Sequence, residues 1–155
     1  MGTRKLLKYG LVRGDMSKSV NAPIGADEVI TITGSRFVTQ DGSGNYEICT
    51  ASSATIAGHL ECEAFTAAAV EGVAAGGDRR LMIIDFDAIF RIPIISGTYT
   101  DAQIGNCCDL VVSGTQQGAA VTTNSHDLLV ITDGDATEAW VEVRMNAAER
   151  YTRTT

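Results

Sequence analysis

Two short clusters of titratable side chains are the best candidates for chemistry in this sequence. His59, Glu61 and Glu63 alternate along one stretch, and an imidazole with two carboxylates on one strand face can bind a transition metal. Asp85 and Asp87 form a D-x-D pattern of the kind that holds divalent cations. Both clusters lie where polar and apolar residues alternate, so an ordinary solvated strand face is the simpler explanation of each. We therefore predict neither a metal site nor a cofactor.

Motifs typical of enzymes are missing from the sequence. It contains no G-x-S-x-G, no phosphate-binding G-x-x-x-x-G-K and no H-E-x-x-H motif. The second histidine, His126, lies in a polar stretch typical of a turn. Residues 13–15 spell the Arg-Gly-Asp tripeptide that integrin-type receptors recognise, but three residues carry little information and we interpret them as a turn. The sequence predicts no catalytic residues and indicates binding and assembly, not an enzyme.

The longest alternating segment spans residues 80–93. Apolar side chains occupy its even positions from 82 to 92, and three charged residues share its odd positions: Asp85, Asp87 and Arg91. A period of two puts these sets on opposite faces of a strand. A strand of about 12 residues is long for a globular domain, and we expect it to bend between two sheets.

Other segments predict further strands. Residues 58–65 place His59 on the polar face opposite Leu60, and residues 139–145 place Ala139 and Val141 inward with Trp140 outward. Shorter strands are expected at 28–33, 36–39, 46–50, 109–112, 119–122 and 128–132. Asp-Gly pairs predict turns at 40–45 and 132–136. An Ala-rich stretch at 66–75, ending at two glycines, is the one helix candidate, although its valines fit a strand equally well. The fold class that follows is all-β: a single-domain β-barrel or β-sandwich with at most one short helix.

Charge is unevenly distributed along the 155 residues, whose formal net charge is -7. Residues 1–18 hold five basic residues against one acid, so the rest of the chain carries -11. We predict a basic N-terminal arm over 1–18, a β-rich domain over 19–155, and partner binding by the basic residues of the arm. These residues are Arg4, Lys5, Lys8, Arg13 and Lys18. The alternative is a solvated terminus that keeps the protein soluble.

The same composition bears on partners and compartment. An acidic body argues against nucleic acid, because phosphate contacts need a concentrated basic surface. No run of about 18 apolar residues predicts a membrane span, and no apolar region follows the basic start as in a secretory signal. The four cysteines, Cys49, Cys62, Cys107 and Cys108, lack zinc-ligand spacing. We expect reduced thiols packed as small apolar side chains.

Three segments carry a resemblance to a known family. They are residues 42–51 followed by 57–61, residues 96–111, and residues 127–136 followed by 140–144. This series of hairpins and closing strands resembles the decoration, or cement, proteins of tailed-bacteriophage capsids. The resemblance implies a structural virion protein, made in the host cytoplasm, that binds the major capsid protein on the capsid exterior. It also implies a dimer or trimer that stabilises the shell against the pressure of the packaged DNA.

Three other functions stay open at this point. A phage tail or fibre component would use the same β-rich body but polymerise. A metal-dependent hydrolase would use Asp85, Asp87 or His59. A carbohydrate-binding β-sandwich would use the outward Trp140 as a stacking platform.

Overall fold

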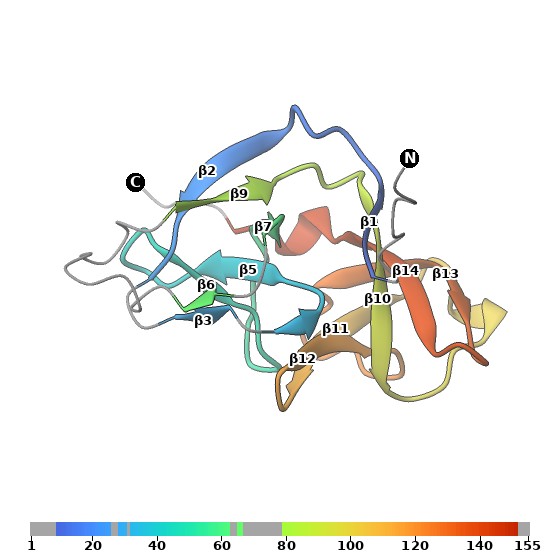
Figure 1. The fold of residues 1–155 in the computed structure, drawn as a ribbon. Helices are drawn as coiled ribbons and strands as arrows, with labels where there is room; N and C mark the ends of the chain where they lie inside the picture. Colours follow the sequence, from blue (N-terminus) through green and yellow to red (C-terminus); the bar gives the residue numbers. More distant parts are fainter. Residues whose placement is uncertain (1–8, 26–27, 31, 63–64, 67–78, 152–155) are drawn as a thin grey trace, which may run out of the picture.

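The computed structural model describes residues 9–25, 28–30, 32–62, 65–66 and 79–151. This part of the chain is mostly β and forms one domain built on two main sheets (Figure 1). The predicted all-β fold class is therefore confirmed. The predicted helix at 66–75 lies outside the described residues except for Thr66, which belongs to a strand. No described helix is long and apolar enough to cross a bilayer.

The larger sheet has seven strands in the order β1-β10-β14-β13-β11-β12-β4. Their bounds are β1 Gly10–Arg13, β4 Thr33–Gly34, β10 Ile89–Ser96, β11 Cys107–Ser113, β12 Gln116–Ala120, β13 Leu129–Asp135 and β14 Trp140–Met145. The sheet curls back on itself, because β10 also pairs in parallel with β12. Five strands, β10, β14, β13, β11 and β12, thus close into a ring, as in a small barrel.

The smaller sheet has five strands in the order β2-β9-β7-β5-β6. These are β2 Ser19–Pro23, β5 Phe37–Gln40, β6 Tyr46–Ile48, β7 Gly58–Leu60 and β9 Arg79–Ile83. A separate antiparallel pair joins β3 Val29–Ile30 to β8 Phe65–Thr66. Two 3₁₀ turns, η2 Asp101–Gln103 and η3 Ala147–Glu149, complete the described elements.

Strands β5 and β7 of the smaller sheet are buried on both faces. Phe37 belongs to the core that fills the barrel, whereas the next residue, Val38, belongs to a second core with Leu60 and Met82. Successive side chains of a strand point to opposite faces, so the sheet separates the two cores. β5 and β7 therefore have no solvated face, and the period-two alternation of a sequence cannot reveal that both faces of a strand are buried.

The segment 80–93 is not one continuous strand. β9 ends at Ile83 in the smaller sheet, the chain turns at Phe86 and Asp87, and β10 begins at Ile89 in the larger sheet. The expected bend between two sheets is confirmed, but the expected alternation through the bend is wrong. Asp85 is buried and Ile84 only half-buried, because Asp85 accepts main-chain hydrogen bonds inside the crossing.

The C-terminal hairpin follows its prediction more closely. Val141 and Val143 are buried, and Trp140 lies on the partly exposed face. Ala139, expected to face inward, is instead an exposed turn residue with φ of 54°. The Asp-Gly pair expected to form the turn lies within β13, which is irregular there and continues to Asp135.

Candidate partner-binding surface

Residues 10–23 form a segment that runs along the edges of both sheets, and we call it the edge segment. It comprises β1, the outer strand of the larger sheet, a short loop, and β2, the outer strand of the smaller sheet. Figure 1 shows it crossing between the sheets beside the connection from β9 to β10. β1 pairs with β10, and β2 pairs with β9. The loop from β1 to β2 and the connection from β9 to β10 therefore cross between the two sheets side by side, in opposite directions.

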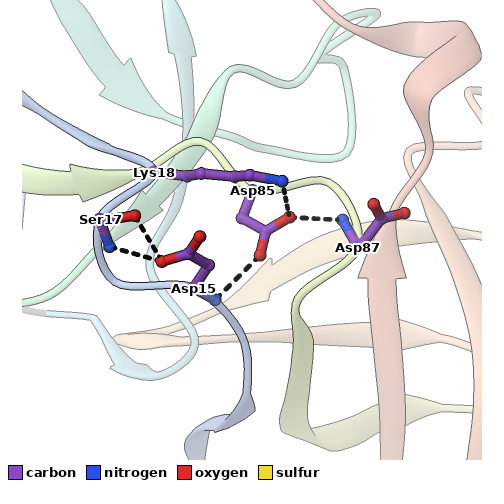
Figure 2. Close-up of polar contacts among 5 residues, drawn as sticks. All are labelled: Asp15, Ser17, Lys18, Asp85 and Asp87. Carbon is purple, nitrogen blue, oxygen red and sulfur yellow. Dashed lines mark hydrogen bonds and ion pairs between the residues drawn. The ribbon is translucent and has the colours of Figure 1, made fainter.

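Asp85 fastens the two crossings to each other (Figure 2). Its side chain is buried, and its Oδ2 accepts the N–H of Asp15 at 3.0 Å while its Oδ1 accepts the N–H of Asp87 at 3.0 Å. Lys18 Nζ lies 3.9 Å from Oδ1. A buried carboxylate is stable only when its oxygens find such partners. Asp85 therefore holds the loop of the edge segment against the core.

Asp15 shapes the loop itself. Its Oδ1 accepts hydrogen bonds from the hydroxyl of Ser17 at 2.6 Å and from the N–H of Ser17 at 2.9 Å. The Ser17 hydroxyl is the main cause that lowers the pKa of Asp15, because both bonds favour the charged carboxylate. Before the loop, Gly14 packs so closely on Ala88 that an added Cβ would lie 2.6 Å from the Ala88 Cβ. The Arg-Gly-Asp tripeptide thus leads into a turn whose aspartate is engaged locally.

The edge segment and its neighbour β9 carry most of the exposed large apolar side chains. Of five among the described residues, four lie here: Val12 at 50%, Met16 at 46%, Val20 at 39% and Leu81 at 41% relative exposure. The fifth, Ile104, lies elsewhere. Leu81 lies opposite Asn21 in the ladder and therefore points to the other face of the sheet from Val20. Val12, Met16 and Val20, all on the anchored edge segment, are the apolar side chains that we assign to the candidate surface.

Basic side chains accompany these apolar ones. Arg13 at the end of β1, Lys18 in the loop and Arg79 at the start of β9 are all exposed. Arg13 and Lys18 are two of the predicted partner-binding residues. The other three, Arg4, Lys5 and Lys8, lie outside the described residues.

The sequence prediction treated residues 1–18 as one arm, whereas residues 10–13 of it are strand β1 of the larger sheet. Sequence reasoning missed the apolar members of the surface. A signal was present for two of them, since Met16 and Val20 are single apolar residues in the otherwise polar stretch 13–21, whereas Val12 follows Leu11.

His59 does not lie on a solvated face, contrary to the prediction. Its side chain is buried against the rings of Phe37 and Phe90, with centroid distances of 4.8 Å and 4.5 Å. Nε2 accepts the N–H of Arg36 at 3.1 Å, and Nδ1 lies 2.7 Å from Glu61 Oε1. Both ring nitrogens are engaged, so His59 is a hydrogen-bonded core residue, and Glu63 lies outside the described residues.

The two carboxylates of the D-x-D pattern point apart. Asp87 is exposed, and in Figure 2 its carboxylate is directed away from Asp85. Within the described ranges, no three His, Cys, Asp or Glu side chains come close enough to hold a metal ion. The other histidine, His126, donates its N–H to Asp109 in a bend.

A shallow depression of about 690 Å³ lies on the barrel, away from the edge segment. Amide and hydroxyl side chains line much of it: Gln103, Asn106, Thr122, Thr123 and Asn124. Cys107 and Asp127 complete its polar wall. Its open, polar character differs from the enclosed and mainly apolar cavities that bind small molecules.

None of the four cysteines is in a disulfide bond. Cys107 and Cys108 lie in β11, and Cys49 follows β6. Burial raises the pKa of Cys49 far above its usual range and that of Cys108 to about 12, because a thiolate loses its hydration inside the core.

The edge segment is the surface whose composition and anchoring point most clearly to a partner. It joins exposed apolar and basic side chains to a backbone fixed by Asp85 and by strand pairing. No protein-family model, curated protein or solved structure matches this chain.

Proposed function

We propose that this chain is a structural virion protein, a capsid decoration protein that binds the outer capsid surface and stabilises the shell. The observation that carries the proposal is the edge segment. Its backbone is anchored to both sheets while Val12, Met16 and Val20 stay exposed beside Arg13 and Lys18. A preorganised apolar and basic surface loses little conformational entropy when it binds.

The charge distribution supports a role on a large assembly. The basic first 18 residues precede a body that carries -11. Basic residues beside the apolar ones steer the surface towards an acidic lattice of the major capsid protein. The acidic body then faces outward, where like charge keeps decorated particles apart. Self-association as a dimer or trimer at the symmetry axes belongs to the same proposal.

The carbohydrate-binding alternative receives less support from the outer face of the barrel. The guanidinium carbon of Arg91 lies 3.8 Å from the ring centroid of Trp140, and Arg91 is also paired with Glu142 at 3.2 Å. One face of the indole is therefore covered, whereas a stacking platform for a sugar needs an open face.

Binding to capsids tests the proposal directly. Capsids of the tailed phage whose genome encodes the chain, stripped of accessory proteins, are mixed with the purified chain and sedimented. We expect saturable binding and a higher temperature of particle disruption. The double variant Val12→Ser/Met16→Ser should bind at least about tenfold more weakly, since buried apolar contacts at an interface contribute roughly 1–2 kcal/mol each.

Ile104→Ser is the matched control, because Ile104 is as exposed as Val12 but lies outside the edge segment. It should bind like the wild type. Absence of wild-type binding to the capsids would overturn the proposal, and so would equal binding by the double variant. Concentration-dependent filaments of the isolated chain would favour the tail or fibre alternative.

A further inference from the structure

Among the described residues, no strand pairs with the outer side of β2, the last strand of the smaller sheet, and we call this side the open edge. Within the described residues β2 pairs with β9 alone, in a regular ladder from Ser19 opposite Ile83 to Pro23 opposite Arg79. Such an edge is a template for another strand unless the protein guards it.

The hydrogen bonds of β9 show which groups of β2 face outward. Leu81 O accepts the N–H of Glu61 on the β7 side, and the N–H of Ile84 donates to Lys18 O on the β2 side. In an antiparallel ladder, consecutive residues alternate between the two sides. In β2, Val20 and Ala22 therefore face β9, whereas Ser19 and Asn21 direct their N–H and C=O groups to the open edge.

The other outer strands are better guarded. β1 has an irregular register and ends in Arg13. β6 has three residues, one of them Glu47, and its first residue, Tyr46, forms a bridge with Ile24, which follows β2 in the chain. β4 has only two residues. β2 is longer than each of these, is regular, and holds no charged residue in Ser-Val-Asn-Ala-Pro. The usual guards are bulges, charges, proline and short length. β2 has one of them, Pro23, at its last position, which leaves Ser19 and Asn21 unguarded.

Basic side chains lie around the open edge. Arg79 donates to Asn21 O at 3.3 Å from its exposed side chain, and Arg80 lies opposite Ala22 on β9. Lys18, beside Asp85 and Asp15, precedes the strand. A second copy of β2 would bring the same cations together, and like charges across a sheet are destabilising. An acidic extended segment is the complementary occupant.

We propose that β2 binds its partner by strand addition: an extended, acid-flanked segment of the capsid shell protein pairs with Ser19 and Asn21. Main-chain hydrogen bonds supply the affinity, and Val20 packs against a side chain of the added strand. The segment replaces Arg79 at Asn21 O, which frees that guanidinium to pair with an acidic residue. This inference rests on the proposed function and names its mode of binding.

Two substitutions of Asn21 separate the contribution of its main-chain N–H to binding from that of its side chain. Asn21→Pro removes an N–H that faces the open edge and takes no part in the ladder with β9, a position where edge strands tolerate proline. Asn21→Ala removes the side chain and keeps the N–H. In the capsid sedimentation assay, we expect Asn21→Pro to bind at least about tenfold more weakly and Asn21→Ala to stay within about twofold of the wild type.

Hydrogen exchange gives a readout that does not depend on the proline variant folding. On binding to the capsids, the peptide that contains residues 18–23 of the wild type and of Asn21→Ala should exchange more slowly. Arg79→Glu should weaken binding, with the largest effect at low salt.

The outcomes distinguish this inference from the proposed function. If the wild type does not bind the capsids, the proposed function itself fails. If the wild type binds but Asn21→Pro, folded by its thermal transition, binds equally well, strand addition is wrong. Strand addition is also wrong if exchange at 18–23 is unchanged.

Two further outcomes would assign the edge differently. Loss of binding in both Asn21 variants assigns the contact to the Asn21 side chain. A dimer of the isolated chain that Asn21→Pro abolishes assigns the edge to a second copy of the chain. Each of these overturns the proposal.

Discussion

The side chain of Gln117 pairs with the main chain of Phe37 as a neighbouring strand would. Its Oε1 accepts the N–H of Phe37 at 2.8 Å, and its Nε2 donates to the Phe37 carbonyl at 3.0 Å. The same amide also bonds the carbonyl of Cys49 and the hydroxyl of Ser35, both at 2.8 Å. Gln117 belongs to β12 and Phe37 to β5, so this fully buried amide joins the larger sheet to the smaller one.

Replacing this amide should destabilise the protein strongly. Gln117→Leu leaves the N–H of Phe37 and the C=O of Cys49 without these partners, and each buried orphan costs about 1–3 kcal/mol. The C=O of Phe37 keeps its hydrogen bond from the N–H of Cys49. We expect a loss of roughly 2–6 kcal/mol in the free energy of unfolding, measured by urea denaturation. The neighbouring Gln116→Leu is the control and should cost under about 1 kcal/mol. Similar losses in the two variants would show that the amide bridge is unimportant.

Asp85 should control the order of the edge segment more than the stability of the whole domain. Asp85→Ala removes the acceptor of the Asp15 and Asp87 N–H groups. We expect faster hydrogen exchange over residues 15–18 and a loss of about 1–3 kcal/mol in global stability. Asp87→Ala, which removes an exposed carboxylate and keeps the N–H, should leave both unchanged. Exchange at 15–18 that is equally slow in Asp85→Ala would contradict this role.

Stability should fall in acid partly through Asp109. Burial alone would raise the pKa of this carboxyl, but hydrogen bonds from the N–H groups of His126, Ser125 and Asp127 outweigh burial and hold the pKa below its usual value. The unfolded chain therefore takes up the proton first as the pH falls. The stabilisation is complete above the unfolded pKa of about 3.9 and is lost as the pH falls through the lower folded value.

Urea denaturation at a series of pH values measures this contribution. The free energy of unfolding of the wild type should decline from about pH 5 downward, and Asp109→Asn should be less stable at pH 7 with a flatter acid profile. An unchanged acid slope in Asp109→Asn would assign the effect to other carboxylates.

Tyr99 and Gly134 should be energetically coupled. A Cβ added to Gly134 would lie 2.6 Å from a ring carbon of Tyr99, and Gly134 does not have the positive φ that favours glycine. Gly134→Ala should cost about 1–3 kcal/mol because the ring must move. Combining it with Tyr99→Leu should cost less than the sum of the single changes, as measured in a double-mutant cycle. Simple additivity would show that the ring does not restrict position 134.

Thiol labelling should divide the cysteines by burial. Cys49 and Cys108 are buried and have raised pKa values. The reactive thiolate is therefore scarce at both positions, and the reagent has no access to the sulfur in the folded protein. We expect both to react with an aromatic disulfide reagent only in urea, as followed by mass spectrometry. Labelling of Cys49 in the native protein as fast as in urea would contradict the buried position.

The parts of the fold that the sequence predicted well are those with one face in water. In β14 the alternation of Val141 and Val143 with polar neighbours gave the correct inward face. The same reasoning failed at His59, because its strand lies between two cores and both faces are buried. The buried His59 side chain depends on hydrogen-bonding partners, the N–H of Arg36 and the carboxylate of Glu61. The alternation of polar and apolar residues along one strand does not reveal these partners.

The candidate surface was predictable in its basic residues and not in its structure. Charge counting selected Arg13 and Lys18, and both are exposed on the edge segment. Their placement depends on a bond between Asp15 and Asp85, which are 70 positions apart in the sequence. The same long-range contact lies where the segment 80–93 divides into β9 and β10. Asp85 is at this division and binds the loop of the edge segment, so it is buried at a position predicted to be solvated.

The position of β14 has a consequence for how the protein comes to be folded. It is the last strand of the described chain, yet it lies between β10 and β13 in the ring. While the chain is being synthesised, β10 and β13 each lack a partner on the side that β14 later occupies. The ring cannot close until the chain has been made as far as Met145, the end of β14. Pairing between strands so distant in sequence is slow to form, and open strands in a nascent chain invite wrong pairing. The order of strands therefore makes the addition of β14 the step that commits this domain to its native state.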